Sequence, residues 1–301
     1  MAGSFGRLHE EVEMGKYRIS AALCLLAGVT GTLAAQNDPV ALQRTEAGPP
    51  FRIADNLYHV GASDSAVYLI VGKDGMILLD AGFAEDSQAV LANVEALGFD
   101  PRRIRYLLNS QAHQDHAGGL AAIKARTGAM MLASRGDKDM LERGGTGDFA
   151  FGDRLLFPPV KVDRIVADGE IVSVGGASVT AHPTPGHTKG CTSWSMKARD
   201  GGRTYDALFI CGASAPGYRL VGNEGYPGVM ADFRASFAKW RRLKCELFLG
   251  AHGSYFGLEG KRARMGPGRV NPFVDPAGCR QFLAEAEKGI EAQAREQAAG
   301  K

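Results

Sequence analysis

The stretch that most constrains the fold is residues 111–116, which read Gln-Ala-His-Gln-Asp-His. It directly follows the apolar run IRYLL of residues 104–108, which is typical of a short strand. The residues Ala-Gly-Gly at 117–119 then open the helical pattern LAAIKARTG. Open α/β folds place their chemistry in loops at the carboxyl ends of strands. The sequence therefore predicts an α/β protein with a metal-binding loop at a strand end.

Strand and helix patterns alternate along the rest of the chain, with no short repeat. Strands are expected at 51–61, 65–82 around a Lys73-Asp74-Gly75 turn, 103–110, 129–134, 161–166, 170–176, 177–183, 191–198, 204–211 and 246–250. Helices are expected at 87–99, 120–127, 135–143, 231–243 and 276–297. Long loops are expected at 144–159 and 213–228, as walls of a substrate site. This order favours one domain, residues 36–301, with two β-sheet layers between helices.

The composition is that of a globular protein, with 45% hydrophobic and 23% charged residues. The 35 Lys and Arg residues nearly balance 33 Asp and Glu residues, for a net charge of +2. A nucleic-acid-binding surface usually needs a marked basic excess, so no nucleic-acid partner is expected.

The amino end has the pattern of a secretory signal peptide. A basic segment at 14–18 precedes an apolar segment at 19–32, and small residues follow before Gln36. We expect residues 1–35 to be removed on export to the periplasm, whether translation starts at Met1 or Met14. A short buried helix is the alternative. No later run approaches the length of a transmembrane helix, so no membrane association is expected after removal.

Export also affects the interpretation of the cysteines, because an oxidising compartment favours disulfides. Cys191 and Cys211 are each ten residues from Gly201, in the turn of an expected hairpin. A cross-strand disulfide between them is our hypothesis, and it leaves Cys245 with Cys279. The alternative is that the cysteines are reduced and buried.

Four histidines occur in turn-like segments after strand patterns. His113 and His116 are in the opening stretch, His187 is in TPGHTKG and His252 is in GAHGS. Together with Asp115 they form a plausible nitrogen and oxygen ligand set for zinc. With Gln111 from the opening stretch, six ligands in two sets of three would suit two metal ions about 4 Å apart.

These residues resemble a known motif. The pattern Gln111-x-His113-x-Asp115-His116, followed by His187 and His252, is similar to the dinuclear zinc motif of the metallo-β-lactamase superfamily, with Gln in place of the usual first His. The segments TPGHTKGCTSW, APGYRLVGN, YPGVMADFRASFA and NPFVDPAGCRQF more narrowly resemble class B, subclass 3 metallo-β-lactamases. The likeness covers roughly residues 50–290. It implies an αββα sandwich with the metals at the edge between the sheets, and a Cys245–Cys279 bridge.

The resemblance also implies roles for single residues. Zinc site one would consist of Gln111, His113 and His187, and zinc site two of Asp115, His116 and His252. Zinc makes water acidic enough to supply hydroxide near neutral pH, and Asp115 would orient this nucleophile. The expected activity is that of a secreted zinc β-lactamase, acting as a monomer on a small carboxylate-bearing substrate.

Two positions depart from the family pattern. Gln111 offers an amide oxygen, a poorer zinc donor than imidazole, so site one should be the weaker site. Gly212 stands where thioester, lactone and phosphodiester hydrolases of the superfamily commonly have a metal-bridging Asp. Ser214 and Tyr218 are candidates for substrate binding. The alternatives are a zinc hydrolase of the same fold acting on a lactone, thioester or other ester, and a metal-binding scaffold without activity.

Overall fold

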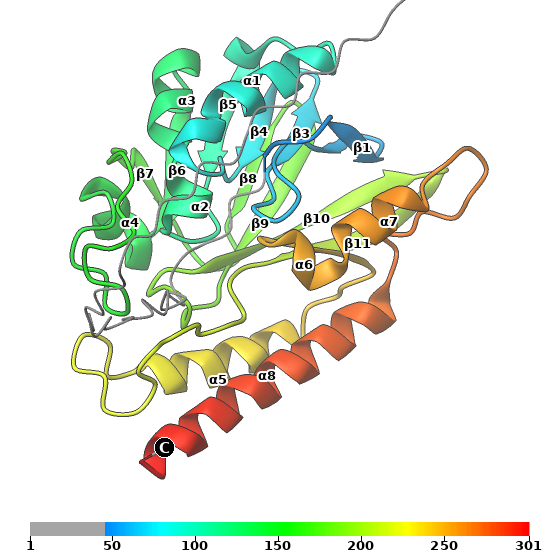
Figure 1. Ribbon diagram of the computed structural model, residues 1–301. Coiled ribbons are helices and arrows are strands. Elements are labelled where there is room, and N and C mark those ends of the chain that lie inside the picture. The colour runs from blue at the N-terminus through cyan, green and yellow to red at the C-terminus, as the bar shows by residue number, and fades with distance from the viewer. Residues whose placement is uncertain (1–45, 301) are drawn as a thin grey trace, which may run out of the picture. The chain divides into compact units, whose positions relative to one another are not determined.

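Two β-sheets lie face to face between layers of helices in the computed structural model, which describes residues 46–300 (Figure 1). This is the predicted αββα sandwich. All described residues fall in one compact unit. The proposed signal peptide, residues 1–35, lies outside the described residues. Within 46–300, no helix is both long and apolar enough to cross a bilayer.

The first sheet has seven strands in chain order. Its first four strands pair antiparallel, and β4 to β7 pair parallel through helical crossovers. The strands are β1 (Phe51–Ala54), β2 (Leu57–His59), β3 (Tyr68–Gly72), β4 (Gly75–Leu79), β5 (Ile104–Leu108), β6 (Met130–Ser134) and β7 (Arg164–Val166).

The second sheet has five strands in the order β12-β11-β10-β9-β8. All neighbours pair antiparallel except β11 and β12, which are parallel. The strands are β8 (Ile171–Val174), β9 (Ala177–Pro183), β10 (Thr192–Asp200), β11 (Arg203–Ile210) and β12 (Leu247–Gly250).

The helices form the outer layers and several short connections. In Figure 1, α1 and α3 lie beside the first sheet, whereas α5 and α8 lie together on the other side of the molecule. The helices are α1 (Ser87–Ala96), α2 (Gln114–Ala117), α3 (Leu120–Thr127), α4 (Arg135–Glu142), α5 (Val229–Trp240), α6 (Gly253–Phe256), α7 (Leu258–Ala263) and α8 (Pro276–Ala298), with 3-10 turns at Ala84–Asp86 and Pro101–Arg103.

Burial on both faces explains why the central strands read as continuous apolar runs. In β5, Leu107 packs with the helices α1 and α3, while the next residue, Leu108, packs between the sheets. Successive side chains of a strand point to opposite faces, so each of these two layers receives alternate residues.

The structure differs from the expected elements in a few places. The strand expected from residue 161 begins at Arg164. The hairpin turn consists of Gly201 and Gly202, because Asp200 pairs with Arg203. Its centre therefore lies between these two glycines and not at Gly201. The short helices α6 and α7 were not expected. They are separated by Gly257, whose φ of 65° is the left-handed conformation that glycine adopts without strain.

Candidate metal centre

Three loops that follow strands bring the predicted ligands together. Gln111 and His113 follow β5, His187 follows β9, and His252 follows β12. The opening stretch is not only a turn, because residues Gln114–Ala117 form the single-turn helix α2. His113 precedes this helix in an extended conformation. Asp115 within it therefore faces a different direction from His113, and the two side chains enter different ligand sets.

The first set consists of Gln111, His113 and His187. The Nδ1 atom of His113 lies 3.1 Å from the Nε2 atom of His187. A Cβ atom built on Gly212 would meet the His187 ring and lie 2.6 Å from the Gln111 Oε1 atom, so both side chains border this glycine. The structure thus brings the three predicted site-one residues together.

The second set consists of Asp115, His116 and His252. The Oδ2 atom of Asp115 lies 3.1 Å from His116 Nε2 and 3.8 Å from His252 Nε2, and the two histidine nitrogens are 3.2 Å apart. One ligand atom from each residue lies within 4.8 Å of the others. One metal ion could contact all three side chains.

The polar atoms at the centre fit metal ligands. Gln111 is fully buried, yet neither its Oε1 nor its Nε2 atom has a hydrogen-bond partner among the described residues. Buried polar groups normally have a partner, and leaving one unpaired costs about 1–3 kcal/mol. The Gln111 side chain, together with five imidazole and carboxylate ligands, therefore fits a divalent metal centre.

The electrostatics of the protein without metal favour a charged Asp115. Burial opposes its ionisation, but the neighbouring His116 lowers the pKa of the Asp115 carboxyl well below its usual range. Burial likewise opposes the charging of His116, while Asp115 raises the pKa of His116 to about 10. Burial and the nearby His113 lower the pKa of His187 to about 3, so its imidazole is neutral and able to bind a metal.

Each of the four imidazoles also has its second ring nitrogen near an oxygen of the protein. These pairs are His252 Nδ1 with Asp64 at 3.1 Å, His116 Nδ1 with Asp80 at 3.4 Å, His113 Nε2 with Asp148 at 3.6 Å, and His187 Nδ1 with the Ser214 carbonyl at 2.7 Å. Such contacts orient the rings and select the tautomer that binds the metal. The three aspartates were not predicted from the sequence.

A buried carboxylate joins two of the ligand loops. Asp137 in α4 accepts hydrogen bonds from the Ala112 N–H at 3.0 Å, the Thr188 hydroxyl at 2.9 Å and the Gly190 N–H at 2.8 Å. Ala112 lies between the ligands Gln111 and His113, and Thr188 follows His187. Asp137 therefore fixes the spacing of the site-one ligands without contacting them.

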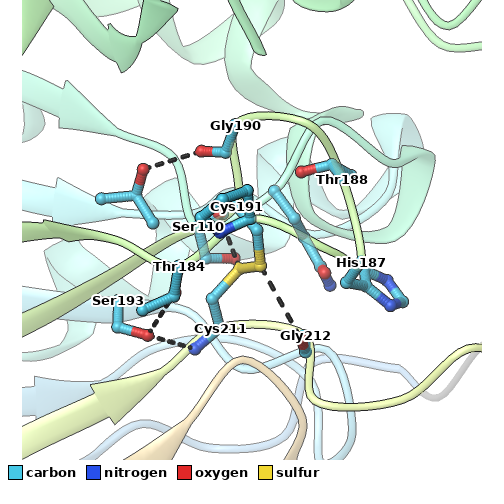
Figure 2. Close-up of a disulfide and its surroundings, with 12 residues drawn as sticks. Ser110, Thr184, His187, Thr188, Gly190, Cys191, Ser193, Cys211 and Gly212 are labelled. Carbon is cyan, nitrogen blue, oxygen red and sulfur yellow. Dashed lines mark hydrogen bonds between the residues drawn. A yellow bond between two sulfur atoms is a disulfide. The ribbon is translucent and has the colours of Figure 1, made fainter. Parts of the chain in front are cut away.

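Both predicted disulfides are present, and one of them supports the metal centre. Cys191 and Cys211 are bonded with their Cα atoms 6.0 Å apart, and Cys245 is bonded to Cys279. Figure 2 shows the first bridge linking the loop that carries His187 to the end of β11, which continues into Gly212. The two cysteines lie just beyond the paired strands β10 and β11, so they close the hairpin where it meets the ligands.

The two predicted substrate contacts have different outcomes. Ser214 lines the cavity beside the ligands. Tyr218, the other candidate for substrate binding, does not line this cavity. The Tyr218 side chain is buried, its ring stacks on His187 at 5.7 Å, and its hydroxyl donates a hydrogen bond to the His187 carbonyl at 2.8 Å. Tyr218 orients a ligand instead.

Four of the six ligands, His113, Asp115, His187 and His252, line a cavity of about 220 Å³. Its walls include Phe151 and Leu155 from the 144–159 loop, and Ser214 and Pro216 from the 213–228 loop. Both loops that were expected as walls of a substrate site therefore line this cavity. A larger cavity of about 670 Å³, beside Cys245 and Cys279, shares no lining residue with this one.

Solved structures similar to this chain include metallo-β-lactamases. The FEZ-1 metallo-β-lactamase of Legionella gormanii matches 85% of this chain and 99% of its own, with a TM-score of 0.83 and 38% identity. BJP-1, a subclass B3 metallo-β-lactamase of Bradyrhizobium japonicum, matches 85% of this chain and 97% of its own, with a TM-score of 0.80 and 39% identity.

Several curated proteins that are similar in sequence are named hydroxyacylglutathione hydrolase and not β-lactamase. A hydroxyacylglutathione hydrolase of Anaeromyxobacter dehalogenans is 31% identical over 256 residues, covering 74% of this chain and 88% of that protein. One from Rhodospirillum rubrum is 31% identical over 186 residues, which is 61% of this chain and only 60% of that protein's length. The family model of the metallo-β-lactamase superfamily matches residues 60–252, a range that contains all six proposed ligands. The chain therefore belongs to the metallo-β-lactamase superfamily of hydrolases.

Proposed function

We propose that the protein is an exported zinc β-lactamase that opens the β-lactam amide and thereby confers resistance to β-lactam antibiotics. The observation that carries the proposal is the packing of Gly212 against Gln111 and His187. A Cβ at this position would collide with the His187 ring as it is placed, and Gly212 itself supplies no carboxylate beside the ligands. Hydrolases of thioesters, lactones and phosphodiesters in this superfamily commonly have a metal-bridging Asp there, and the β-lactamases that the chain resembles do not.

The ligands would hold two zinc ions, one on Gln111, His113 and His187 and one on Asp115, His116 and His252. When bound, zinc polarises a carbonyl group and makes water acidic enough to act as a nucleophile near neutral pH. The Asp115 carboxylate, charged and 96% buried, would orient the attacking water by accepting its hydrogen bond.

The cavity walls would bind the rest of the substrate. Phe151 and Leu155 are almost fully buried and would shield the reacting amide from bulk water. The Ser214 hydroxyl lies in the opposite loop and would donate a hydrogen bond to the substrate carboxylate. The protein would act as a monomer on this small molecule.

Two features support export. The amino-terminal segment has the pattern of a signal peptide. Both disulfides suit an oxidising compartment such as the periplasm. Detection of the mature chain in a periplasmic extract, beginning near residue 36, would test this location.

A thioester hydrolase is the second candidate, favoured by the relatives named hydroxyacylglutathione hydrolase. The test is to assay one zinc-loaded preparation with a chromogenic cephalosporin and with a hydroxyacylglutathione thioester. We expect cephalosporin turnover that disappears with a chelator and returns with zinc. Turnover of the thioester alone would reject the β-lactamase proposal, and turnover of neither would favour a scaffold role.

A further inference from the structure

A second cavity, of about 490 Å³, adjoins the cavity of the metal centre. The two share Ser214, Pro216 and Tyr255 as lining residues. The far wall of the second cavity is helix α8, which contributes no residue to the first. The second cavity therefore lies directly beside the metal centre, with α8 on its far side.

Tyr255 forms the partition between the cavities. Its ring centre lies 5.1 Å from that of the ligand His252 and 4.7 Å from that of Phe282 in α8. An aromatic group that passes Tyr255 would meet the Phe282 ring next. Aromatic rings at such distances contribute about 0.5–1.5 kcal/mol beyond the burial of their area.

The lining of the second cavity is apolar with one acidic group. Phe282, Ala286 and Ile290 present one face of α8. Glu285 lies on the same lining, accepts a hydrogen bond from the Gln281 amide at 2.8 Å, and forms no ion pair with another described residue. An apolar surface beside an uncompensated carboxylate suits an aromatic group that carries a positive charge.

The walls are fixed relative to one another in the protein. The Gln293 side chain in α8 donates hydrogen bonds to the carbonyls of Ala215 at 2.9 Å and Tyr218 at 3.1 Å. Gln297 donates to Tyr218 at 2.6 Å and accepts from the Leu220 N–H at 2.6 Å. These bonds hold the loop that carries Ser214 against α8, so the cavity is formed before a ligand enters.

We propose that this second cavity is a specificity site that binds the C3 substituent of a cephalosporin, with a preference for an aromatic cation such as pyridinium. The assignment rests on the proposed function. If Ser214 holds the carboxylate on C4, the neighbouring carbon C3 lies at the same shared wall. Its substituent then points toward Glu285 and Phe282 rather than toward the metal ligands.

Gly289 provides a direct test. It is exposed in the middle of α8, lines the second cavity only, and a Cβ atom on it would meet no atom within 4 Å. Gly289→Leu would place a side chain in the cavity and narrow it, and it should not weaken the helix, since leucine is a better helix former than glycine. Gly289→Ala adds one methyl group and is the matched control. Glu285→Gln removes the charge but keeps the shape.

The assay compares two cephalosporins with the same acyl side chain, one with a pyridinium-methyl group at C3 and one with a methyl group. We expect Gly289→Leu to raise KM about tenfold for the pyridinium substrate only, with Gly289→Ala close to wild type. Glu285→Gln should raise the same KM about threefold, with bound zinc unchanged. Equal changes in KM for both substrates would overturn the assignment of the second cavity but not the proposed function. No turnover of either substrate by the zinc-loaded wild type would overturn the proposed function and the assignment with it.

Discussion

The Nδ1 atom of His113 and the Nε2 atom of His187 face each other at 3.1 Å, although the residues are 74 positions apart in the chain. The second nitrogen of His187 lies 2.7 Å from the Ser214 carbonyl, where it can only donate. The Nε2 atom of neutral His187 is therefore an acceptor with its lone pair directed at His113. Gln111 is the third ligand of site one. Its neutral amide is the reason why we expect this site to bind metal more weakly than site two.

Gln111→His should tighten metal binding at site one by about tenfold or more, because imidazole is a better zinc donor than an amide oxygen. The measurement is zinc content after dialysis against a graded chelator. Gln114→His is the control, since Gln114 in α2 is half-buried and lines no part of the cavity. Two zinc ions held equally well by the wild type would contradict the assignment of a weak site one.

Tyr218→Phe should weaken metal retention at site one and leave the KM for substrate within about twofold of wild type. The Tyr218 hydroxyl donates to the His187 carbonyl, and the loss of that hydrogen bond should cost about 1 kcal/mol of stability. Urea denaturation and cobalt titration measure the two effects. A large rise in KM with unchanged metal retention would show that the hydroxyl acts on the substrate after all.

The two disulfides should differ in their effect on the metal centre. Closing loops of 20 and 34 residues should each stabilise the fold by about 3 to 4 kcal/mol. The double substitution Cys191→Ala/Cys211→Ala should also weaken site one, because it frees the His187 loop from the end of β11. Cys245→Ala/Cys279→Ala is the matched control, which should lose stability but keep its metal retention at site one. Equal metal retention in the two variants would show that the Cys191–Cys211 bridge does not support the centre.

The sequence was sufficient to predict the order of the strands and of the longer helices, both disulfides and the residues that meet at the centre, but not the short helices α2, α6 and α7. These features depend on local patterns, such as apolar periodicity and the spacing of ligands after strands. The contacts that orient the ligands depend on packing between distant segments. Asp64 meets His252 across 188 positions, and Asp137 meets Gly190 across 53. An aspartate in a loop or a helix has no local pattern that reveals such a partner.

Tyr218 illustrates the same limit. Its position in APGYRLVGN identified a loop near the metals, but the direction of its side chain depends on His187 and on the glutamines of α8. The 144–159 and 213–228 loops were correctly expected as cavity walls. The second cavity was not expected, because it needs α8, whose sequence pattern shows an amphipathic helix but not what faces it.

Asp137 should give the protein without metal a measurable pH dependence. Burial raises the pKa of the Asp137 carboxyl from its ordinary value of 3.8 to about 6. The folded state then binds this proton more tightly than the unfolded state does. The contribution of this group to the free energy of unfolding is therefore greatest below about pH 4, and it is lost as the pH rises through about 6. Asp137→Asn removes the titration. It should also destabilise the fold by about 1–3 kcal/mol, because an amide nitrogen replaces one of the two oxygens and cannot accept either from Gly190 or from Ala112 and Thr188, depending on which oxygen is replaced. Urea denaturation of the chelator-treated protein between about pH 4 and pH 7 should give a flatter profile of unfolding free energy against pH for this variant than for wild type.

Asp139→Asn is the control for this experiment. It changes an exposed position in the same helix and should keep the wild-type profile. Parallel profiles for Asp137→Asn and wild type would mean that this carboxyl titrates alike in the folded and unfolded chains.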